Sequence, residues 1–352
     1  MNLYDNTLYM EDVRRTAQLD LPWDSFTDRA VLISGATGLV GSFLIDVLME
    51  RNERFSMNCR VYALGRSEEK ARARFGARSS DPLFTFIPYD INLPFVREDI
   101  GRVDYVLHLA ANTHPMQYAT DPIGTITTNI IGLQNMLEFA CAHEAARFAF
   151  ASSNEIYGEN RGDVELFGEE YCGYIDCNTL RAGYPESKRC GEALCQAYRK
   201  QRGIEVCIPR LTRSYGPTML MTDTKAISQF IRKGIAGEDI VLKSAGTQYY
   251  SYTYVADAVS GLLTVLLKGE SGEAYNIADE ASDITLRDLA AQIAENAGSK
   301  VIFEIPDAVE AQGYSKATKA RLDGTKLRQL GWKPVYDIRS GIRRTMEILR
   351  QS

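Results

Sequence analysis

The 352-residue sequence has no long apolar run, and no stretch of it approaches the roughly 20 residues that are needed to cross a bilayer. Residues 1–29 are too polar for a secretory signal peptide. Basic residues are not in surplus either, because 40 Lys and Arg stand against 46 Asp and Glu and leave a formal net charge of -6. General nucleic-acid binding needs the opposite balance. We therefore expect a cytoplasmic protein that binds neither membranes nor nucleic acid.

Patterns typical of metal sites and disulfide frameworks are missing too. The three histidines, His108, His114 and His143, have no metal-ligand spacing with cysteines or acidic residues, so we expect no bound metal. The seven cysteines are odd in number and form no Cys-x-x-Cys pair. Reduced, mostly buried thiols are therefore expected.

From residue 29 onward, short apolar runs alternate with segments of helical period. The runs predict strands at 30–34, 60–64, 85–87, 105–110, 148–151 and 205–210. The segments between them predict helices at 39–51, 68–75, 125–142 and 184–201. This alternation predicts an α/β fold, a Rossmann-type doubly wound parallel sheet that binds its ligands at the carboxyl ends of the strands.

The rhythm becomes less regular after residue 216. We assign residues 29–216 to an NAD(P)-binding domain, with 251–267 returning to it, and residues 217–250 and 268–352 to a smaller C-terminal substrate-binding lobe. Helices are expected in the second half at 226–236, 256–267, 286–297 and 338–349. Residues 1–28 show no clear period and are interpreted as an N-terminal extension that docks through Trp23 and Phe26.

A glycine-rich turn follows the first predicted strand and opens an apolar helix. Its glycines permit a tight turn and a close approach of the backbone to a pyrophosphate, which the positive end of the helix stabilises. Its position between strand and helix makes it a specific sign of a bound dinucleotide. The residues expected to contact that cofactor are Gly35, Thr37, Gly38, Leu39, Val40 and Gly41.

The second strand ends at Gly65-Arg66-Ser67, where an NAD-selective site usually has an acidic residue for the ribose hydroxyl. Arg66 could pair with a 2'-phosphate, stack on adenine or remain solvated, so the cofactor is NAD or NADP. Asp90 and Ile91, after the third strand, are placed to meet the adenine. The end of the fourth strand adds three expected cofactor contacts, Leu109, Ala110 and Ala111.

Tyr184-Pro-Glu-Ser-Lys188 begins a predicted helix, on which residues four apart share a face. A Lys188 ammonium near the Tyr184 hydroxyl lowers a phenol pKa that starts near 10 and makes the tyrosine usable as an acid or base. The strand before it ends at Ser152-Ser153, and we choose Ser153 as the hydroxyl that bonds the reacting substrate oxygen.

This order of glycine turn, serine and Tyr-x-x-x-Lys resembles that of the extended short-chain dehydrogenases/reductases, the NAD-dependent epimerase/dehydratase family, from about residue 29 to about residue 350. Within the family the motifs are most similar to those of the UDP-glucuronate decarboxylases. The matching stretches are His108-Leu-Ala110, Pro115-x-x-Tyr118-x-x-x-Pro122-Ile-x-Thr125-x-x-Thr128-Asn129-x-x-Gly132-x-x-Asn135-Met-Leu, Tyr171-x-Gly173, Arg181-x-x-Tyr184-x-x-x-Lys188-Arg, Tyr215-Gly-Pro-x-Met219-x-Met221-x-Asp223 and Leu330-Gly-Trp332.

The resemblance implies conversion of a nucleotide-activated sugar through a transient ketone. Besides Tyr184 and Lys188, it makes Ser153 and Glu155 catalytic and gives Asn129 a supporting role in the Lys188 network. Asn129, Tyr184 and Lys188 are also expected to contact the cofactor. His108 is interpreted as a satisfied residue at the end of a strand, not as a catalyst. The residues expected to bind the carbohydrate substrate are Thr113, Asn154, Arg181, Arg213 and Tyr250.

A decarboxylase or an epimerase is favoured over a dehydratase, because the family's dehydratases have Asp where this chain has Asn154, which cannot supply a proton. Glu155 keeps dehydration open. The helices at 125–142 and 184–201 match the pair through which relatives often dimerise, so a homodimer is expected.

Three positions depart from the nucleotide-sugar enzymes, which have Arg where this chain has Tyr250, Arg in the segment matched by 315–321, and Arg where this chain has Thr218. Tyrosine cannot replace a guanidinium on a pyrophosphate. Either another cation takes over or the substrate is not a nucleotide diphosphate sugar. The candidate cations are Arg213, Lys225, Lys316 and Lys319.

Two alternatives therefore stay open. The chain could be an NADPH-dependent reductase of a sugar or sugar-phosphate ketone, which exchanges its cofactor at each turnover. It could also be a non-catalytic cofactor-binding protein that kept the fold, although the intact Ser153, Tyr184 and Lys188 disfavour this.

Overall fold

The computed structural model describes residues 3–113, 115–304 and 318–351. Within them, the main layer is an eight-stranded parallel sheet in the order β11-β7-β5-β4-β1-β2-β3, with β6 paired to the end of β7. Its strands are β1 (Ala30–Ser34), β2 (Arg60–Gly65), β3 (Phe84–Pro88), β4 (Tyr105–His108), β5 (Arg147–Phe150), β6 (Ser152–Ser153), β7 (Glu205–Leu211) and β11 (Ala274–Ile277). The predicted doubly wound Rossmann-type sheet is confirmed.

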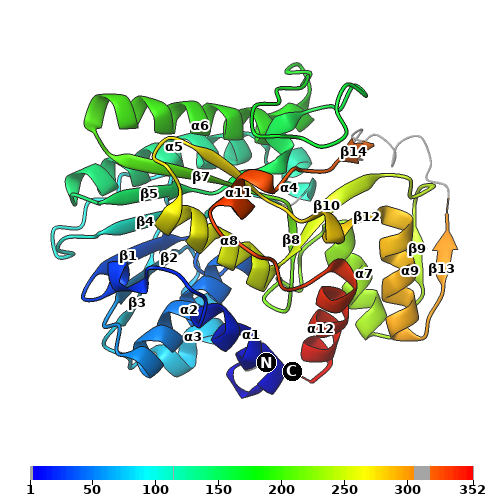
Figure 1. The fold of residues 1–352 in the computed structure, drawn as a ribbon, viewed down its shortest axis with the longest axis horizontal. Coiled ribbons are helices and arrows are strands. Elements are labelled where there is room, and N and C mark those ends of the chain that lie inside the picture. Colours follow the sequence, from blue (N-terminus) through cyan, green and yellow to red (C-terminus); the bar gives the residue numbers. More distant parts are fainter. Residues whose placement is uncertain (1–2, 114, 305–317, 352) are drawn as a thin grey trace.

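Helices cover both faces of this sheet (Figure 1). One face carries α2 (Leu39–Phe55), α3 (Glu68–Phe75) and α8 (Val255–Lys268), and the other carries α5 (Pro122–Ala142) and α6 (Gly183–Arg202). Local residues set the ends of these helices. The Asp121 side chain accepts the Gly124 backbone N–H and caps the start of α5, and Gly203 ends α6 in the left-handed conformation, at φ 74°. A short helix, α4 (Pro115–Thr120), precedes α5.

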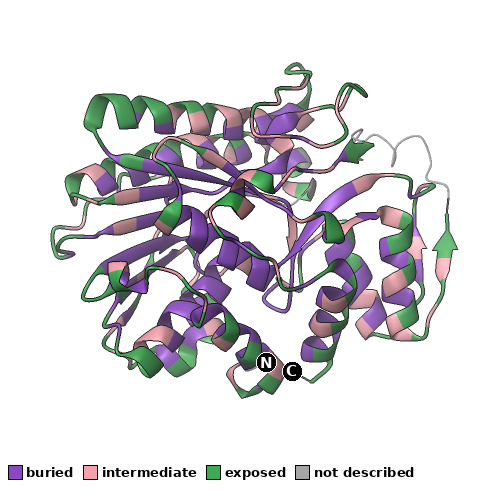
Figure 2. Cartoon of the chain, viewed as in Figure 1, coloured by how far each residue is buried: buried purple, intermediate pink, exposed green. Residues whose placement is uncertain are grey.

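Burial is concentrated in the strands of this sheet and the helix faces against it (Figure 2). All five residues of β1 are buried, because a central parallel strand has both faces covered. Each fully buried aliphatic side chain contributes about 1.5–3 kcal/mol relative to exposure. The sheet is thus a rigid base for the loops at its carboxyl edge.

A smaller mixed sheet and its helices form the second lobe. The sheet contains β8 (Arg213–Tyr215), β10 (Tyr249–Tyr254), β12 (Asp283–Thr285) and β14 (Lys319–Ala320), and a separate pair joins β9 (Ile240–Leu242) to β13 (Val301–Phe303). The helices are α7 (Ala226–Ile235), α9 (Leu286–Ala297), α11 (Thr325–Gln329) and α12 (Ile338–Gln351). One strand from the range 268–352, β11, instead pairs with β7 at the edge of the large sheet.

The N-terminal extension contains a helix that the sequence analysis did not predict, α1 (Thr7–Ala17). It packs on α2, α8 and α12, which places the two ends of the chain side by side (Figure 1). Trp23 and Phe26 are buried, at 5% and 0% exposure, so docking through these side chains is confirmed. The extension is part of the folded core.

All seven cysteines are free thiols. The expectation that they are mostly buried is wrong, because three lie on the surface of loops and of α6. The buried ones are Cys59, Cys195 and Cys207, Cys141 is intermediate, and the exposed ones are Cys172, Cys177 and Cys190. Among the described helices, none is long and apolar enough to span a membrane.

Candidate active site

A cavity of about 1410 Å³ lies at the carboxyl ends of the large sheet's strands and extends to the smaller lobe. A pocket for one small molecule typically measures about 300–1,000 Å³, so this one has room for two ligands side by side. The large sheet contributes one wall, and residues of β8, α7, β9 and β10 contribute the other.

The glycine-rich turn forms one end of the cavity. Gly35 has φ 73°, and a Cβ built there would lie 2.7 Å from the Ala110 backbone nitrogen. A Cβ on Gly41 would lie 2.5 Å from the Gly35 carbonyl oxygen, so neither position accommodates a side chain. Helix α2 begins at Leu39 and turns its first N–H groups, which lack intrahelical acceptors, toward this end. The turn can hold an anion such as a pyrophosphate.

The next stretch of wall follows β2 and β3. Arg66 is exposed, and among the described residues it has no ion-pair partner. Asp90 and Ile91 lie nearby, and Ile91 is buried against Gly132, where a Cβ would approach its side chain to 2.7 Å. An adenosine half of a dinucleotide fits here. All the predicted cofactor residues line the cavity except one, Asn129.

Asn129 is a correction to the predicted Lys188 network. It is fully buried behind the cavity wall, and its Nδ2 donates a 2.8 Å hydrogen bond to the Ser187 hydroxyl. Ser187 in turn donates to the Tyr184 carbonyl oxygen at 2.8 Å. Asn129 therefore bonds the backbone turn of α6 that carries Tyr184, and not Lys188.

Tyr184 and Ser153 meet at the centre of the cavity. Both side chains line the cavity, and the Ser153 hydroxyl accepts the Glu155 backbone N–H at 3.2 Å. Burial, and after it the charge of Glu155, raise the pKa of Tyr184, while the nearby Ser153 hydroxyl lowers it. In this environment the phenol holds its proton near neutral pH. We predicted that Lys188 lowers the pKa of the Tyr184 phenol, but Lys188 is not among the groups that shift this pKa.

Lys188 lies one turn further along α6 and is fully buried, with its Nζ donating to the Ala151 carbonyl oxygen at 2.8 Å. Burial lowers its pKa to about 7, and the charge of Glu192 opposes the shift. His108 is buried beside it, with Nδ1 2.8 Å from the Ser34 hydroxyl. Burial, and then Lys188, lower the pKa of His108 to about 3, so this imidazole is neutral. His108 was predicted to have its hydrogen bonds satisfied. Its Nδ1 has a partner in Ser34, but its Nε2 has none among the described residues.

Glu155 is held by an ion pair that the sequence analysis did not anticipate. Arg181 donates to its carboxylate at 2.8 Å and stands 4.8 Å above the Tyr118 ring. The Tyr118 ring stacks on Tyr184, with centroids 5.2 Å apart. Tyr118 belongs to a motif quoted above, but nothing in the sequence alone indicated that it faces the catalytic tyrosine. The group brings a carboxylate, a guanidinium and two phenols to one point.

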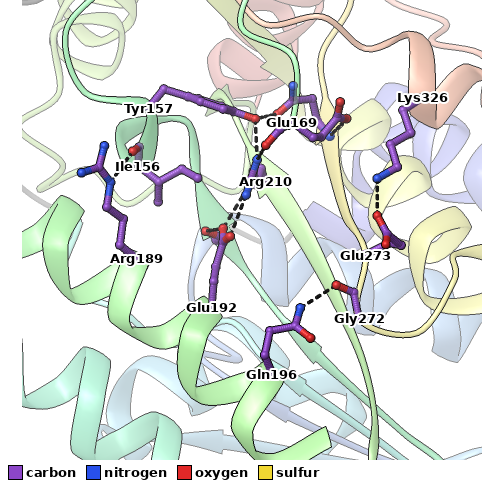
Figure 3. A network of polar contacts seen from close by, with 12 residues as sticks. Ile156, Tyr157, Glu169, Arg189, Glu192, Gln196, Arg210, Gly272, Glu273 and Lys326 are labelled. Atoms are coloured by element: carbon purple, nitrogen blue, oxygen red, sulfur yellow. Dashed lines mark hydrogen bonds and ion pairs between the residues drawn. The ribbon is translucent and has the colours of Figure 1, made fainter. Parts of the chain in front are cut away.

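A polar network behind the site joins α6 to the sheet (Figure 3). Glu192 accepts two hydrogen bonds from Arg210, at 3.0 and 2.7 Å, and a 2.5 Å bond from the Ser152 hydroxyl. Arg210 also donates to the Tyr157 hydroxyl at 2.9 Å. Because Glu192 follows Lys188 by one turn, it fixes α6 against the strand that carries Ser153.

The residues expected to bind the substrate all line the cavity; they are Thr113, Asn154, Arg181, Arg213 and Tyr250. Lys225 donates to the Thr113 hydroxyl at 3.2 Å and pairs with Asp223 at 3.2 Å. Lys319 is exposed on β14 and is not among the lining residues, and Lys316 lies outside the described residues. The site therefore includes the predicted residues from both lobes.

The doubly wound sheet, its glycine turn and the Ser153–Tyr184–Lys188 grouping define a dinucleotide-dependent enzyme of the short-chain dehydrogenase type. Residues 31–278 match the model of the NAD dependent epimerase/dehydratase family. The chain belongs to this family.

Two curated relatives illustrate the match. UDP-glucuronic acid decarboxylase 5 of Arabidopsis thaliana is 32% identical over 317 residues, which cover 89% of this chain and 86% of that protein. UDP-glucuronic acid decarboxylase 1 of Xenopus tropicalis is 33% identical over 325 residues, 92% of this chain and 72% of that protein.

Solved structures share the fold at lower identity. The dTDP-glucose 4,6-dehydratase DesIV of Streptomyces venezuelae, with NAD and TYD bound, superimposes with a TM-score of 0.78 at 24% identity and covers 92% of this chain and 97% of that chain. The UDP-glucuronic acid 4-epimerase of Bacillus cereus, with UDP-glucuronic acid and NAD, gives 0.76 at 21% identity, with coverage of 92% and 99%. These likenesses establish the architecture.

Proposed function

We propose that this enzyme oxidises one hydroxyl of a nucleotide-activated uronic acid to a transient ketone, releases carbon dioxide and reduces the ketone again. The main support for this proposal is that Tyr184, Ser153 and Glu155 lie together in a cavity with room for two ligands. The relatives named UDP-glucuronic acid decarboxylases, at 32–33% identity over most of both chains, support this substrate.

The chain's residues fit a nicotinamide dinucleotide. The turn at Gly35 and Gly41 leaves no space for a Cβ, which suits a backbone that approaches a pyrophosphate closely. Arg66 and Asp90 would flank the adenosine half, and the nicotinamide end would face Tyr184 and Lys188. A bound oxidised nicotinamide supplies a reversible hydride acceptor and a positive charge that favours the Tyr184 phenolate.

Tyr184 takes the proton of the reacting hydroxyl, and Ser153 hydrogen-bonds the same oxygen as it becomes a carbonyl. Because burial and Glu155 raise the pKa of Tyr184, the tyrosine is a strong base once its proton has left. Lys188, whose pKa burial lowers to about 7, exchanges a proton easily near neutral pH and can stabilise either state of the phenol. The two side chains form one proton relay.

In a uronic acid, a ketone at C4 stands next to C5, which bears the carboxylate. The C5–carboxylate bond then breaks, carbon dioxide leaves, and the electron pair moves into an enolate whose oxygen Ser153 and Tyr184 can bond. A proton would then add at C5, and the Tyr184 proton would return to the oxygen. The hydride that C4 gave up when the ketone formed would return to it from the bound nicotinamide, so no net oxidation would occur. We assign the transfer of the C5 proton to Glu155, whose carboxylate is held by Arg181.

Dehydration is the less favoured outcome, because Asn154 has no proton to give to a departing hydroxyl. Epimerisation shares the ketone, but it keeps the carboxylate and returns the hydride to the opposite face of C4. Incubation with UDP-glucuronate distinguishes the two, since a decarboxylase forms a UDP-pentose and carbon dioxide, whereas an epimerase conserves the carboxylate. We expect the former.

Tyr184→Phe tests the catalytic assignment. It removes one hydroxyl from a buried ring and should abolish turnover of UDP-glucuronate while the far-ultraviolet circular dichroism spectrum stays unchanged. Tyr171→Phe is the matched control, because its hydroxyl bonds Asp163 at 2.9 Å outside the cavity, and this variant should keep full activity. Undiminished turnover in Tyr184→Phe would refute the role of this tyrosine.

One observation favours a second candidate, an NADPH-dependent reductase of a sugar ketone. The exposed Arg66 stands where an acidic residue would select NAD, so a 2'-phosphate is acceptable there. The two functions differ in whether the enzyme keeps its cofactor: a decarboxylase regenerates it within each turnover, whereas a reductase must exchange it. The reductase would be supported if the enzyme consumed one NADPH for each ketose reduced and did not convert UDP-glucuronate.

We also propose that two copies associate through α5 and α6. Ile123 and Ile131 on α5 are 76% and 43% exposed, which is a cost that a second copy would relieve. Light scattering at micromolar concentration should give twice the mass of one chain. Ile123→Glu with Ile131→Glu should return it to a single chain.

A further inference from the structure

The cavity contains one arginine whose guanidinium is oriented by a ring instead of by an acid. Arg213, at the start of β8, places its Cζ 3.5 Å from the centroid of Tyr250 on the paired strand β10. Both side chains line the cavity. Stacking on an aromatic face fixes the plane of a guanidinium while leaving its N–H edge available.

Arg213 has not been neutralised by its surroundings. Of its five N–H donors, none is taken by a hydrogen-bond acceptor in the described part of the chain, and no carboxylate there lies within ion-pair distance. Its Nη1 is buried without a partner. An unpaired buried donor destabilises the folded protein, and an anion bound at this point would remove that cost.

Three other cations that line the cavity, Arg181, Lys188 and Lys225, have partners. Arg181 pairs with Glu155, and Lys225 pairs with Asp223. Lys188 is bound to the Ala151 carbonyl oxygen in the catalytic relay. Arg213 therefore combines a fixed plane with free donors, which is the arrangement that binds two oxygens of a phosphate at once.

The position of Arg213 also suits a sugar phosphate. Leu211 is the register partner of Ser153, and Arg213 follows Leu211 by two residues. At about 3.3 Å per residue and about 4.8 Å between strands, the Arg213 and Ser153 backbones are on the order of 10 Å apart. A hexose whose reacting hydroxyl meets Ser153 can span this interval and carry its phosphate to Arg213.

We infer that Arg213, held by Tyr250, binds the diphosphate of the substrate nucleotide. The inference rests on the proposed function and names the residue that gives this chain its affinity for an activated sugar. A phosphate monoester on a free sugar offers the same oxygens, so the two sources are separated by experiment.

The experiment is isothermal titration of NAD-loaded protein with UDP, uridine and glucose 1-phosphate at one ionic strength. Arg213→Gln should weaken UDP binding roughly 10- to 100-fold, the range for one charge-assisted pair of hydrogen bonds, and leave uridine unchanged. Tyr250→Leu keeps the charge and loses the stacking surface, so a smaller loss is expected. Arg321→Gln is the matched control, since Arg321 pairs with Glu165 and is not among the lining residues.

The outcomes separate the two claims. If the parent protein binds UDP and Arg213→Gln binds it equally well, the inference is overturned and the proposed function stands. If the parent protein does not bind UDP but binds glucose 1-phosphate in an Arg213-dependent way, the anion site stands with a sugar phosphate as its ligand, and the nucleotide part of the proposed function fails. Binding of neither ligand overturns the inference.

Discussion

Replacing Lys188 by Met should remove a pH-dependent cost from the cofactor-free protein. Burial lowers the pKa of Lys188 from 10.5 to about 7. Between these values the unfolded chain binds a proton that the folded protein has released, so the stability of the native protein rises with pH. Below about pH 7 both states are charged, and the folded state bears the whole cost of the buried ammonium.

The size of this effect follows from the interval between the two pKa values of Lys188, about 7 and 10.5. Within that interval each pH unit changes the free energy of unfolding by about 1.4 kcal/mol, so Lys188 should raise it by about 2–3 kcal/mol between pH 6 and pH 9. Lys188→Met lacks this contribution. The variant also leaves the Ala151 carbonyl oxygen without its 2.8 Å donor, a loss of about 1–3 kcal/mol that is the same at both pH values.

The assay is urea unfolding of the parent protein and Lys188→Met at pH 6 and pH 9, at equal ionic strength. The difference in unfolding free energy between the two proteins should shift by about 2–3 kcal/mol in favour of the parent protein at pH 9. Lys326→Met, which removes a partly exposed lysine paired with Glu273, controls for the loss of any lysine. A difference for Lys188→Met that is the same at both pH values would refute the reasoning.

Three further predictions concern other parts of the molecule. Glu192→Gln should lower kcat with little change in KM. It should also move the limb of the kcat–pH profile that reports Lys188 to lower pH, because the charge of Glu192 raises the pKa of Lys188. An unchanged profile would show that Glu192 only supports the fold. Asp46→Asn should reduce the free energy of unfolding by about 3–5 kcal/mol, because it removes the buried partner of an ion pair and leaves Arg74, whose side chain is only 16% exposed, without its counter-charge. Urea denaturation measures this. Arg66→Asp should weaken NADP binding roughly 10- to 100-fold and spare NAD, as measured by fluorescence titration; equal losses for both cofactors would place Arg66 away from the 2'-phosphate.

The sheet and the cofactor end of the site were predictable because their signals are local. Strand β1 and the turn at Gly35 appear in the sequence as an apolar run followed by spaced glycines, and backbone sterics leave few other structures for them. Tyr184 and Lys188 share a helix face by spacing alone. Ser153 followed from the carboxyl end of the preceding strand.

The remaining features depend on contacts between distant residues, which no local pattern encodes. Helix α1 escaped prediction because Asp12 interrupts its apolar face, and only the fold shows that Tyr254 and Arg344 bind this buried acid, at 2.7 and 2.6 Å. Tyr118 and Arg181 reach the site from separate elements. Asn129 reaches α6 through the hydroxyl of Ser187, a contact that its position in the motif did not reveal.

The central claim is that a sugar is oxidised and reduced again within one turnover on this chain, and the most direct measurement follows the hydride. UDP-glucuronate deuterated at C4 is converted by the purified enzyme with unlabelled NAD, and the product is examined by NMR and mass spectrometry. We expect a decarboxylated product that keeps its deuterium at C4. Loss of the deuterium to solvent or to released cofactor, or a product that keeps its carboxylate, would contradict this claim.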